Sequence, residues 1–320
     1  MKPDAAALER PFRIIAFDWD GTAVVDRQAD AHPVAARLEE LMKLGVWIVV
    51  ITGTNFNNID RQFCRLISGP HKQKLYVLTN RGSEVFGFDA NSQPVLVYRR
   101  EATERENELL TKIANSVRDW VWDHAGLKID IVYDRLNRRK IDMIPEPEWA
   151  DPPKSRIGEL LEATQHRLTS GGIPGGIKQL YTLTEDLARE YGLPDARLTT
   201  DVKYIEVGLT DKSDSVDWVT GTLAPRVGAA PADIIFLGDE FGPIAGFDGS
   251  DFKMVTKSAE ASLFVSVGKE PNGVPESVLH VGGGPARFLE LMDRQIALHG
   301  GRPVADGPRP SEAAKAQIVD

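Results

Sequence analysis

Apolar residues form three short continuous runs in this chain, and each run stops at a polar residue or a glycine. The runs cover residues 12–17 (FRIIAF), 46–51 (VWIVVI) and 233–237 (DIIFL), and they are followed by Asp, by Thr-Gly and by Gly-Asp. Continuous runs rich in Ile and Val are typical of strands that are buried on both faces of a parallel sheet. The pattern therefore predicts three core strands whose carboxyl ends carry polar groups.

The segment between the first two runs, PVAARLEELMKLG, predicts an amphipathic helix. Leu38, Leu41 and Met42 fall on one helical face, Pro33 suits the first turn, and Gly45 stands where a helix ends. Strand, helix and strand in this order make a β-α-β unit. A second helix is expected at residues 56–68.

The middle of the chain has a different pattern. The stretches KLYVLTNRGSEVFGF, PVLVYRR, IDIVYD and RKIDMI predict strands of an antiparallel sheet with hairpin-like links. Helices are expected at about 102–125 and 155–169, a loop at 170–176, and a returning strand in VKYIEVGL. After the third core strand, two short strands and a closing helix are expected at residues 252–256, 263–267 and 282–298.

Together these elements predict an α/β fold with a doubly wound, Rossmann-like parallel-sheet core that is interrupted by an α+β module. The core is expected to consist of residues 11–79 and 204–298, and the inserted module of residues 80–203. Residues 1–10 and 299–320 are expected to be flexible tails, the second because it is rich in Pro, Gly, Ala and charge.

Composition narrows the class of partner. The net charge is −9 among 320 residues, without the basic footprint of a nucleic-acid-binding protein. Cys64 is the only cysteine, so no internal disulfide forms, which fits a reducing cytoplasm. No secretory signal or membrane-length apolar run is recognised, so a cytoplasmic protein without a membrane partner is expected. The sequence leaves the oligomeric state open.

The three strand ends predict one common site, because ligands of open α/β sheets bind at the carboxyl ends of the strands. Asp18 and Asp20 are two residues apart in an extended segment, so their side chains point to the same side. Two carboxylates so close repel each other unless a cation compensates. Mg²⁺, which prefers oxygen ligands, is the expected cofactor. The simpler alternative is an acidic turn that caps a helix.

A phosphate ester needs the chemistry that these two carboxylates offer. Asp18, at the strand end, is expected to attack phosphorus and form an aspartyl-phosphate. Asp20 is expected to protonate the leaving alcohol and later to activate water.

Three further strand-end or helix-start segments complete this hypothesis. The Thr52 hydroxyl and the backbone N–H groups of Gly53 and Thr54 are expected to bind the phosphoryl oxygens. Lys212, at the start of a helix expected at about 213–223, would supply positive charge, and Asp239 would complete the metal site. Each has a simpler alternative: Thr52 as a helix cap, Lys212 as a surface lysine and Asp239 as a turn residue.

These segments resemble the four motifs of the haloacid dehalogenase-like (HAD) hydrolase superfamily. FDWDGT resembles the first motif, VVITGT the second, DKSDS the third and FLGDE the fourth, and the resemblance extends over residues 12 to 298. It implies the same roles for the two aspartates, the threonine, the lysine and the acidic fourth motif, and it implies a phosphoric monoester hydrolase.

The insert resembles a type-II cap. YVLTNRGSEVF is similar to the start of the α+β cap in the Cof-like branch, which includes phosphomannomutases and several sugar-phosphate phosphatases. RRKIDMIPEP is faintly similar to a phosphomannomutase cap motif, with Asp142 and Pro145 in matching places. This similarity makes Arg138, Arg139 and Lys140 candidates for contact with a polar or anionic substrate group, and a solvated basic turn is the alternative.

Two departures from the family pattern stand out. The family places a second acidic metal-site residue soon after the first aspartate of motif four, and Asp251 is its best match here, with Asp248 and Glu240 as competitors. The second motif reads TGT where Cof-like enzymes often have TGR, so an arginine that helps to define the substrate is missing.

The expected function is hydrolysis of a small phosphorylated metabolite, in particular a sugar phosphate, because a cap over the site favours small substrates. A phosphomutase would use the same Asp18 chemistry and return the phosphoryl group to the sugar. A third alternative is a non-catalytic sugar-phosphate sensor. Such a protein would not need all four of the catalytic positions that this sequence contains.

Overall fold

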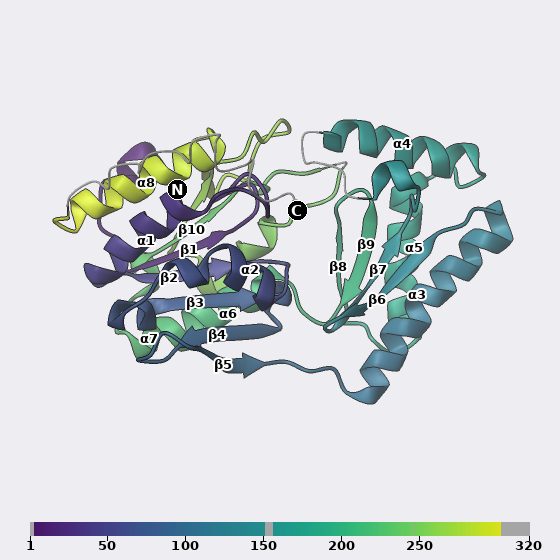
Figure 1. Ribbon diagram of the computed structural model, residues 1–320. Coiled ribbons are helices and arrows are strands. Elements are labelled where there is room, and N and C mark those ends of the chain that lie inside the picture. Colours follow the sequence, from purple (N-terminus) through teal and green to yellow (C-terminus); the bar gives the residue numbers. More distant parts are fainter. Residues whose placement is uncertain (1–2, 151–155, 245, 302–320) are drawn as a thin grey trace, which may run out of the picture.

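The computed structural model describes residues 3–150, 156–244 and 246–301. Within these residues the chain forms two β-sheets, each with its own helices, which lie side by side in Figure 1. No helix in the described ranges combines the length and apolar character needed to cross a membrane. Residues 302–320, most of the predicted C-terminal tail, lie outside the described residues.

The first sheet has eight strands and contains all three predicted core strands. Its first six strands in space are mutually parallel, and the last two strands are joined by antiparallel pairing, the seventh to the sixth and the eighth to the seventh. This arrangement, with helices on both faces, confirms the predicted α/β fold. The strands in spatial order are β12 (Val278–His280), β11 (Leu263–Ser266), β10 (Ile234–Gly238), β1 (Ile14–Asp18), β2 (Trp47–Ile51), β3 (Leu75–Thr79), β4 (Glu84–Phe88) and β5 (Pro94–Arg99).

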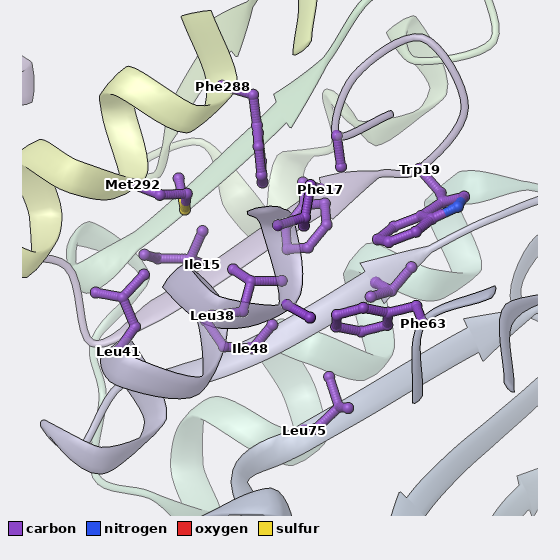
Figure 2. Packing of buried hydrophobic residues seen from close by; sticks show 14 of the residues in the cluster. Ile15, Phe17, Trp19, Leu38, Leu41, Ile48, Phe63, Leu75, Phe288 and Met292 are labelled. Atoms are coloured by element: carbon purple, nitrogen blue, oxygen red, sulfur yellow. The ribbon is translucent and has the colours of Figure 1, made fainter. Parts of the chain in front are cut away.

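Alternate residues of β1 face opposite layers of the core. Ile15 and Phe17 pack with α1 (His32–Lys43) and α8 (Gly284–Leu298), whereas Ile14 and Ala16 pack with the layer that contains α6 (Lys212–Trp218) and α7 (Ala224–Arg226). Figure 2 shows the first layer, where Phe17 and Phe288 meet with ring centroids 4.8 Å apart. Burial on both faces explains why the strand has no polar alternation.

The second sheet has four antiparallel strands, β6 (Asp130–Arg135), β7 (Arg138–Asp142), β9 (Tyr204–Gly208) and β8 (Arg197–Thr200), in that order. It packs against α3 (Glu104–Ala125), α4 (Ile157–Ser170) and α5 (Gly176–Glu190) through a separate apolar cluster. The predicted insert, residues 80–203, contains most of this unit. It also contains β4 and β5, which pair with the core sheet, and it omits β9. The division into core and cap remains a prediction.

Some local expectations differ from the structure. Residues 252–256 do not form a strand; Phe252–Met254 is a 3-10 turn, whose apolar Met254 fills the core. The apolar side chains of this segment indicate burial in the core, and burial alone does not require an extended strand. The elements predicted from the sequence do not include β12, β8 or α5. Within the predicted N-terminal tail, Ala5–Leu8 form a 3-10 turn, and the Arg10 carbonyl accepts a hydrogen bond from Gln295 of α8.

The remaining elements agree closely with expectation. The helices predicted at about 102–125 and 155–169 correspond to α3 and α4, and the closing helix corresponds to α8. The helix predicted at 56–68 is shorter: α2 covers Phe56–Gln62 and a 3-10 turn follows at Cys64–Leu66. Cys64 is buried there among apolar side chains, and burial raises the pKa of its thiol.

We expect Phe288→Ala to lower the free energy of unfolding by about 3–5 kcal/mol, because it leaves a cavity against Phe17 in a fully buried layer. Chemical denaturation with fluorescence detection measures this change. Val25→Ala, at a side chain 66% exposed, is the matched control and should change stability by less than about 0.5 kcal/mol. Equal effects of the two substitutions would contradict the described packing.

Candidate active site

Parallel pairing brings the polar residues after β1, β2 and β10 to one edge of the sheet. Asp18 pairs in register with Ile51, the residue before Thr52, and Phe17 pairs with Leu237. Since the three strands end level with one another, the residues that follow them meet there, as the sequence predicts. The same edge of the sheet faces the N-terminus of α6.

Lys212 lies at the centre of this edge. Its Nζ donates to Asp18 Oδ1 at 2.7 Å and to Asp251 Oδ1 at 2.6 Å, and its side chain is only 4% exposed. Burial by itself lowers the pKa of the ammonium group, but the carboxylates of Asp18 and Asp251 outweigh burial and raise it. The lysine is therefore a fixed positive charge and not the surface residue of the simpler alternative.

The first turn of α6 holds Lys212 in place. Asp211 is the N-cap residue, and its side chain accepts from the backbone N–H of Ser213 at 2.8 Å. Asp214 completes a capping box by accepting from the backbone N–H of Asp211, also at 2.8 Å. The acidic residues of DKSDS therefore serve the helix start, and the lysine between them is left to face the site.

Of the three acidic residues that compete for the second acidic position, Asp251 is the one whose carboxylate lies close to those of Asp18 and Asp239. It is fully buried, and its Oδ2 accepts from the backbone N–H groups of Asp239 and Glu240 at 2.8 and 2.9 Å. Asp248 is half exposed and lies 3.8 Å from Lys253. Glu240 lines a cavity that is described below, and its carboxylate accepts a hydrogen bond from the Ser250 hydroxyl.

Asp251 can approach this closely because residue 238 is a glycine. A Cβ atom at Gly238 would lie 2.5 Å from Asp251 Oδ2. The glycine of FLGDE therefore leaves space for a carboxylate that arrives from a loop twelve residues later in the chain.

Three carboxylates form the candidate metal centre. Asp18, Asp239 and Asp251 each offer an oxygen atom, and these atoms lie within 4.8 Å of one another. An all-oxygen donor set of this size fits Mg²⁺. Thr22 donates to Asp239 Oδ1 at 3.1 Å and so orients that carboxylate. Asp20, also expected as a ligand, lines the same cavity but is not one of this trio.

The segment Thr52–Thr54 is a tight turn that faces the same cavity. Thr52 is buried, and its hydroxyl accepts from the backbone N–H of Thr54 at 3.3 Å. The helix that follows is capped by Asn55, whose side chain accepts from Asn58 N. Thr52 is therefore not the cap of α2, which removes the simpler alternative for this residue.

A cavity of about 300 Å³ joins these groups to the second sheet. Arg138 and Lys140 line it, but Arg139 does not. Side chains alternate along β7, so Arg139 points to the other face, where its Nε donates to the Thr111 hydroxyl of α3 at 3.0 Å. Two of the three basic candidates from the sequence thus reach the cavity.

Arg81 and Glu206 also line this cavity, and both were missed from the sequence. Arg81 follows β3, and its Nε lies 3.0 Å from Oε2 of Glu206 on β9. The missed signal was the run LYVLT before Asn-Arg-Gly, which ends at a polar segment like the other core strands. Because this stretch was predicted to belong to an antiparallel sheet, the parallel pairing of β3 with β2 was not expected.

Comparison with known proteins finds similarity in structure and none in sequence families. No protein-family model and no curated sequence matches the chain. An IMP-nucleotidase from Plasmodium falciparum superposes with a TM-score of 0.59 at 12% identity, over 91% of this chain and 69% of the other. A trehalose-6-phosphate phosphatase from Aspergillus fumigatus gives 0.56 at 14% identity, over 93% and 98%. The chain therefore shares its overall fold with these two solved structures, in agreement with the α/β fold that the sequence predicts.

We expect Mg²⁺ to raise the melting temperature of the protein, and Asp239→Ala to weaken Mg²⁺ binding by about tenfold or more, since it removes one of three anionic ligands. Calorimetric titration with MgCl₂ measures the affinity directly. Asp248→Ala, at the competing aspartate, is the matched control. An unchanged titration for Asp239→Ala would remove that residue from the metal centre.

Proposed function

We propose that this protein is a Mg²⁺-dependent phosphatase that hydrolyses a small phosphorylated metabolite through an aspartyl-phosphate on Asp18. The observation that carries the proposal is the position of the Asp18 carboxylate. It ends a buried strand, touches the Lys212 ammonium group at 2.7 Å, and lines a cavity together with Asp20 and the turn at Thr52–Thr54. A nucleophile, an acid/base and a cradle for phosphoryl oxygens are the three groups that this reaction requires.

The reaction divides into two displacements at phosphorus. In the first, an Asp18 oxygen forms a bond to phosphorus while the bond to the ester oxygen breaks, and Asp20 gives its proton to the departing alkoxide. In the second, Asp20 accepts a proton from water as that water displaces Asp18 and releases phosphate. The same carboxyl group therefore acts first as acid and then as base.

The charge that builds on the phosphoryl oxygens is met by one cation and by neutral hydrogen-bond donors. Lys212 is held against Asp18, and the Thr52–Thr54 turn offers a hydroxyl and backbone N–H groups. When bound, Mg²⁺ would be held by Asp18, Asp239 and Asp251, and it would polarise a phosphoryl oxygen and bring the anionic substrate to the anionic nucleophile.

The size and lining of the cavity favour a small polar substrate. Its volume is about 300 Å³, and the second sheet contributes hydroxyl and charged groups from Thr199, Thr200 and Asp201. Such groups suit hydrogen bonds to sugar hydroxyls, which supports a sugar phosphate as the substrate. One structural neighbour is named for a sugar phosphate and another for a nucleoside monophosphate, so both classes belong in a substrate panel.

We expect Asp18→Asn to abolish Mg²⁺-dependent phosphate release while the protein stays folded, with a loss of about three orders of magnitude or more. The measurement is phosphate release from a panel of sugar phosphates and nucleoside monophosphates, with and without MgCl₂. Retention of a few per cent of activity, once contamination is excluded, would exclude the nucleophilic role. A wild-type phosphoryl-enzyme that forms without phosphate release would identify a mutase instead.

We expect Asp20→Asn to permit some phosphorylation of Asp18 and to slow hydrolysis of the intermediate, because the amide cannot accept a proton from water. Rapid quenching with a ³²P-labelled substrate measures the trapped phosphoryl-enzyme. Accumulation in the variant above the wild-type level would support the acid/base role. Steady-state rates equal to those of the wild type would contradict it.

A further inference from the structure

Arg81 has a backbone conformation that arginine rarely adopts. Its φ and ψ are 54° and 47°, in the left-handed region, where a side chain with a Cβ atom is disfavoured. Its backbone N–H donates to the Thr52 carbonyl at 3.1 Å, and the preceding Asn80 N–H donates to the Thr54 carbonyl at 2.9 Å. Strain of this kind persists where the surroundings fix the chain, and it is often found at functional sites.

The neighbouring Gly82 fixes the other side of this segment. A Cβ at Gly82 would lie 2.9 Å from the Asp211 carbonyl oxygen and 3.0 Å from Ser215, so the chain packs directly on the start of α6. The Arg81 segment is therefore wedged between the Thr52–Thr54 turn and the helix that carries Lys212. These are the two elements assigned above to the phosphoryl group.

The Arg81 side chain lies over the turn. A Cβ at Gly53 would be 3.7 Å from both Cγ and Nε of Arg81, and the arginine lines the cavity together with Asp18. Its side chain is only 15% exposed. Burial lowers the pKa of the guanidinium, but the carboxylates of Glu206, Asp201 and Glu240 outweigh it and raise the pKa, so the charge is retained.

One carboxylate serves as counter-ion to three cations. Glu206 lies 3.0 Å from Arg81 Nε, 3.2 Å from Arg138 Nη1 and 3.1 Å from Lys140 Nζ. Arg81 Nε is buried and makes no hydrogen bond among the described residues, although this ion pair is close. A guanidinium has more N–H donors than a carboxylate shared with two other cations can accept from.

We propose that Arg81 is a substrate-binding residue whose guanidinium binds an oxygen of the substrate phosphoryl group beside the Thr52–Thr54 turn, with Glu206 as its resting counter-ion. The inference rests on the proposed function and names a contact that the four motifs do not contain. An arginine arriving from β3 supplies the cation that is absent from the second motif, where TGT stands in place of TGR. Arginine suits this role because its planar fork matches phosphate oxygens.

The competing explanation is an ion pair that only ties the two sheets together. The two explanations differ in the direction in which Glu206→Gln is expected to change the affinity for phosphate. If Arg81 binds phosphate, Glu206 competes electrostatically with the ligand, so Glu206→Gln should preserve or tighten phosphate binding while Arg81→Gln weakens it. If the pair is only structural, the two substitutions should change affinity in the same direction or not at all.

The test is calorimetric titration of the full chain with inorganic phosphate in the presence of MgCl₂. We expect Arg81→Gln to weaken phosphate binding by about tenfold, and Arg81→Lys to recover part of the loss, since a charged hydrogen bond is removed and then partly restored. With a turned-over substrate, KM should rise more than kcat falls. Arg118→Ala, at an arginine of α3 that is 41% exposed, is the matched control.

Three results would overturn the inference. The first is a phosphate affinity of Arg81→Gln within twofold of the wild type, and the second is a loss of phosphate affinity in Glu206→Gln as large as that in Arg81→Gln. The third is a wild-type protein that does not bind phosphate. Thermal unfolding of each variant shows whether a loss follows from misfolding, and Arg81→Lys provides the readout if the glutamine variant is unstable. Phosphate binding that depends on Arg81, in a protein that releases no phosphate from any ester, would support the inference while overturning the phosphatase proposal.

Discussion

The contact of the Lys212 ammonium group with Asp18 and Asp251 is the interaction on which this site depends. Three carboxylates from three separate segments meet at one edge of the sheet, and Asp251 is fully buried. Without a cation, repulsion and desolvation would drive such a cluster apart or force it to take up protons. Lys212 bridges two of the three at 2.6 and 2.7 Å, so the Asp18 carboxylate is oriented before any ligand arrives.

The cations that line the cavity come from both sheets, whereas the Asp18, Asp239 and Asp251 carboxylates lie at the edge of the eight-stranded sheet. Lys212 and Arg81 belong to segments that flank the eight-stranded sheet, and Arg138 and Lys140 extend from the four-stranded sheet. Glu206 joins the two groups. Under the proposed function, Asp18 and its partners belong to the eight-stranded sheet, so the lining that the second sheet contributes is able to vary without disturbing them.

The sequence predicts the residues that meet at the edge of the eight-stranded sheet better than the residues that the rest of the cavity contributes. Asp18, Thr52 and Asp239 were found because each follows an apolar run, and parallel strands bring such ends together. Asp251 follows no strand, and it was found only through resemblance to a family motif. Its position depends on a loop and on the space left by Gly238, and neither leaves a periodic signal.

The errors have physical causes as well. Residues 252–256 contain the apolar Phe252, Met254 and Val255, and Met254 fills the core at a 3-10 turn, so hydrophobicity alone could not separate a strand from a buried turn. Arg81 was missed because β3 is followed by the antiparallel strand β4, and the residues from 80 onward were therefore assigned to the insert. Alternation along β7 was available from the sequence, and it would have separated Arg139 from Arg138 and Lys140.

The register of the central strands also bears on how the chain folds during synthesis. Ile14 pairs with Ile234, so the partner on one side of β1 emerges from the ribosome long after β1 itself. Until then β1 has only β2 beside it, and its other edge stays open to incorrect pairing. The four-stranded sheet and α3–α5 are complete before β10 is made. If this unit folds first, it draws the two halves of the large sheet together and shortens the effective loop that β1 and β10 must close.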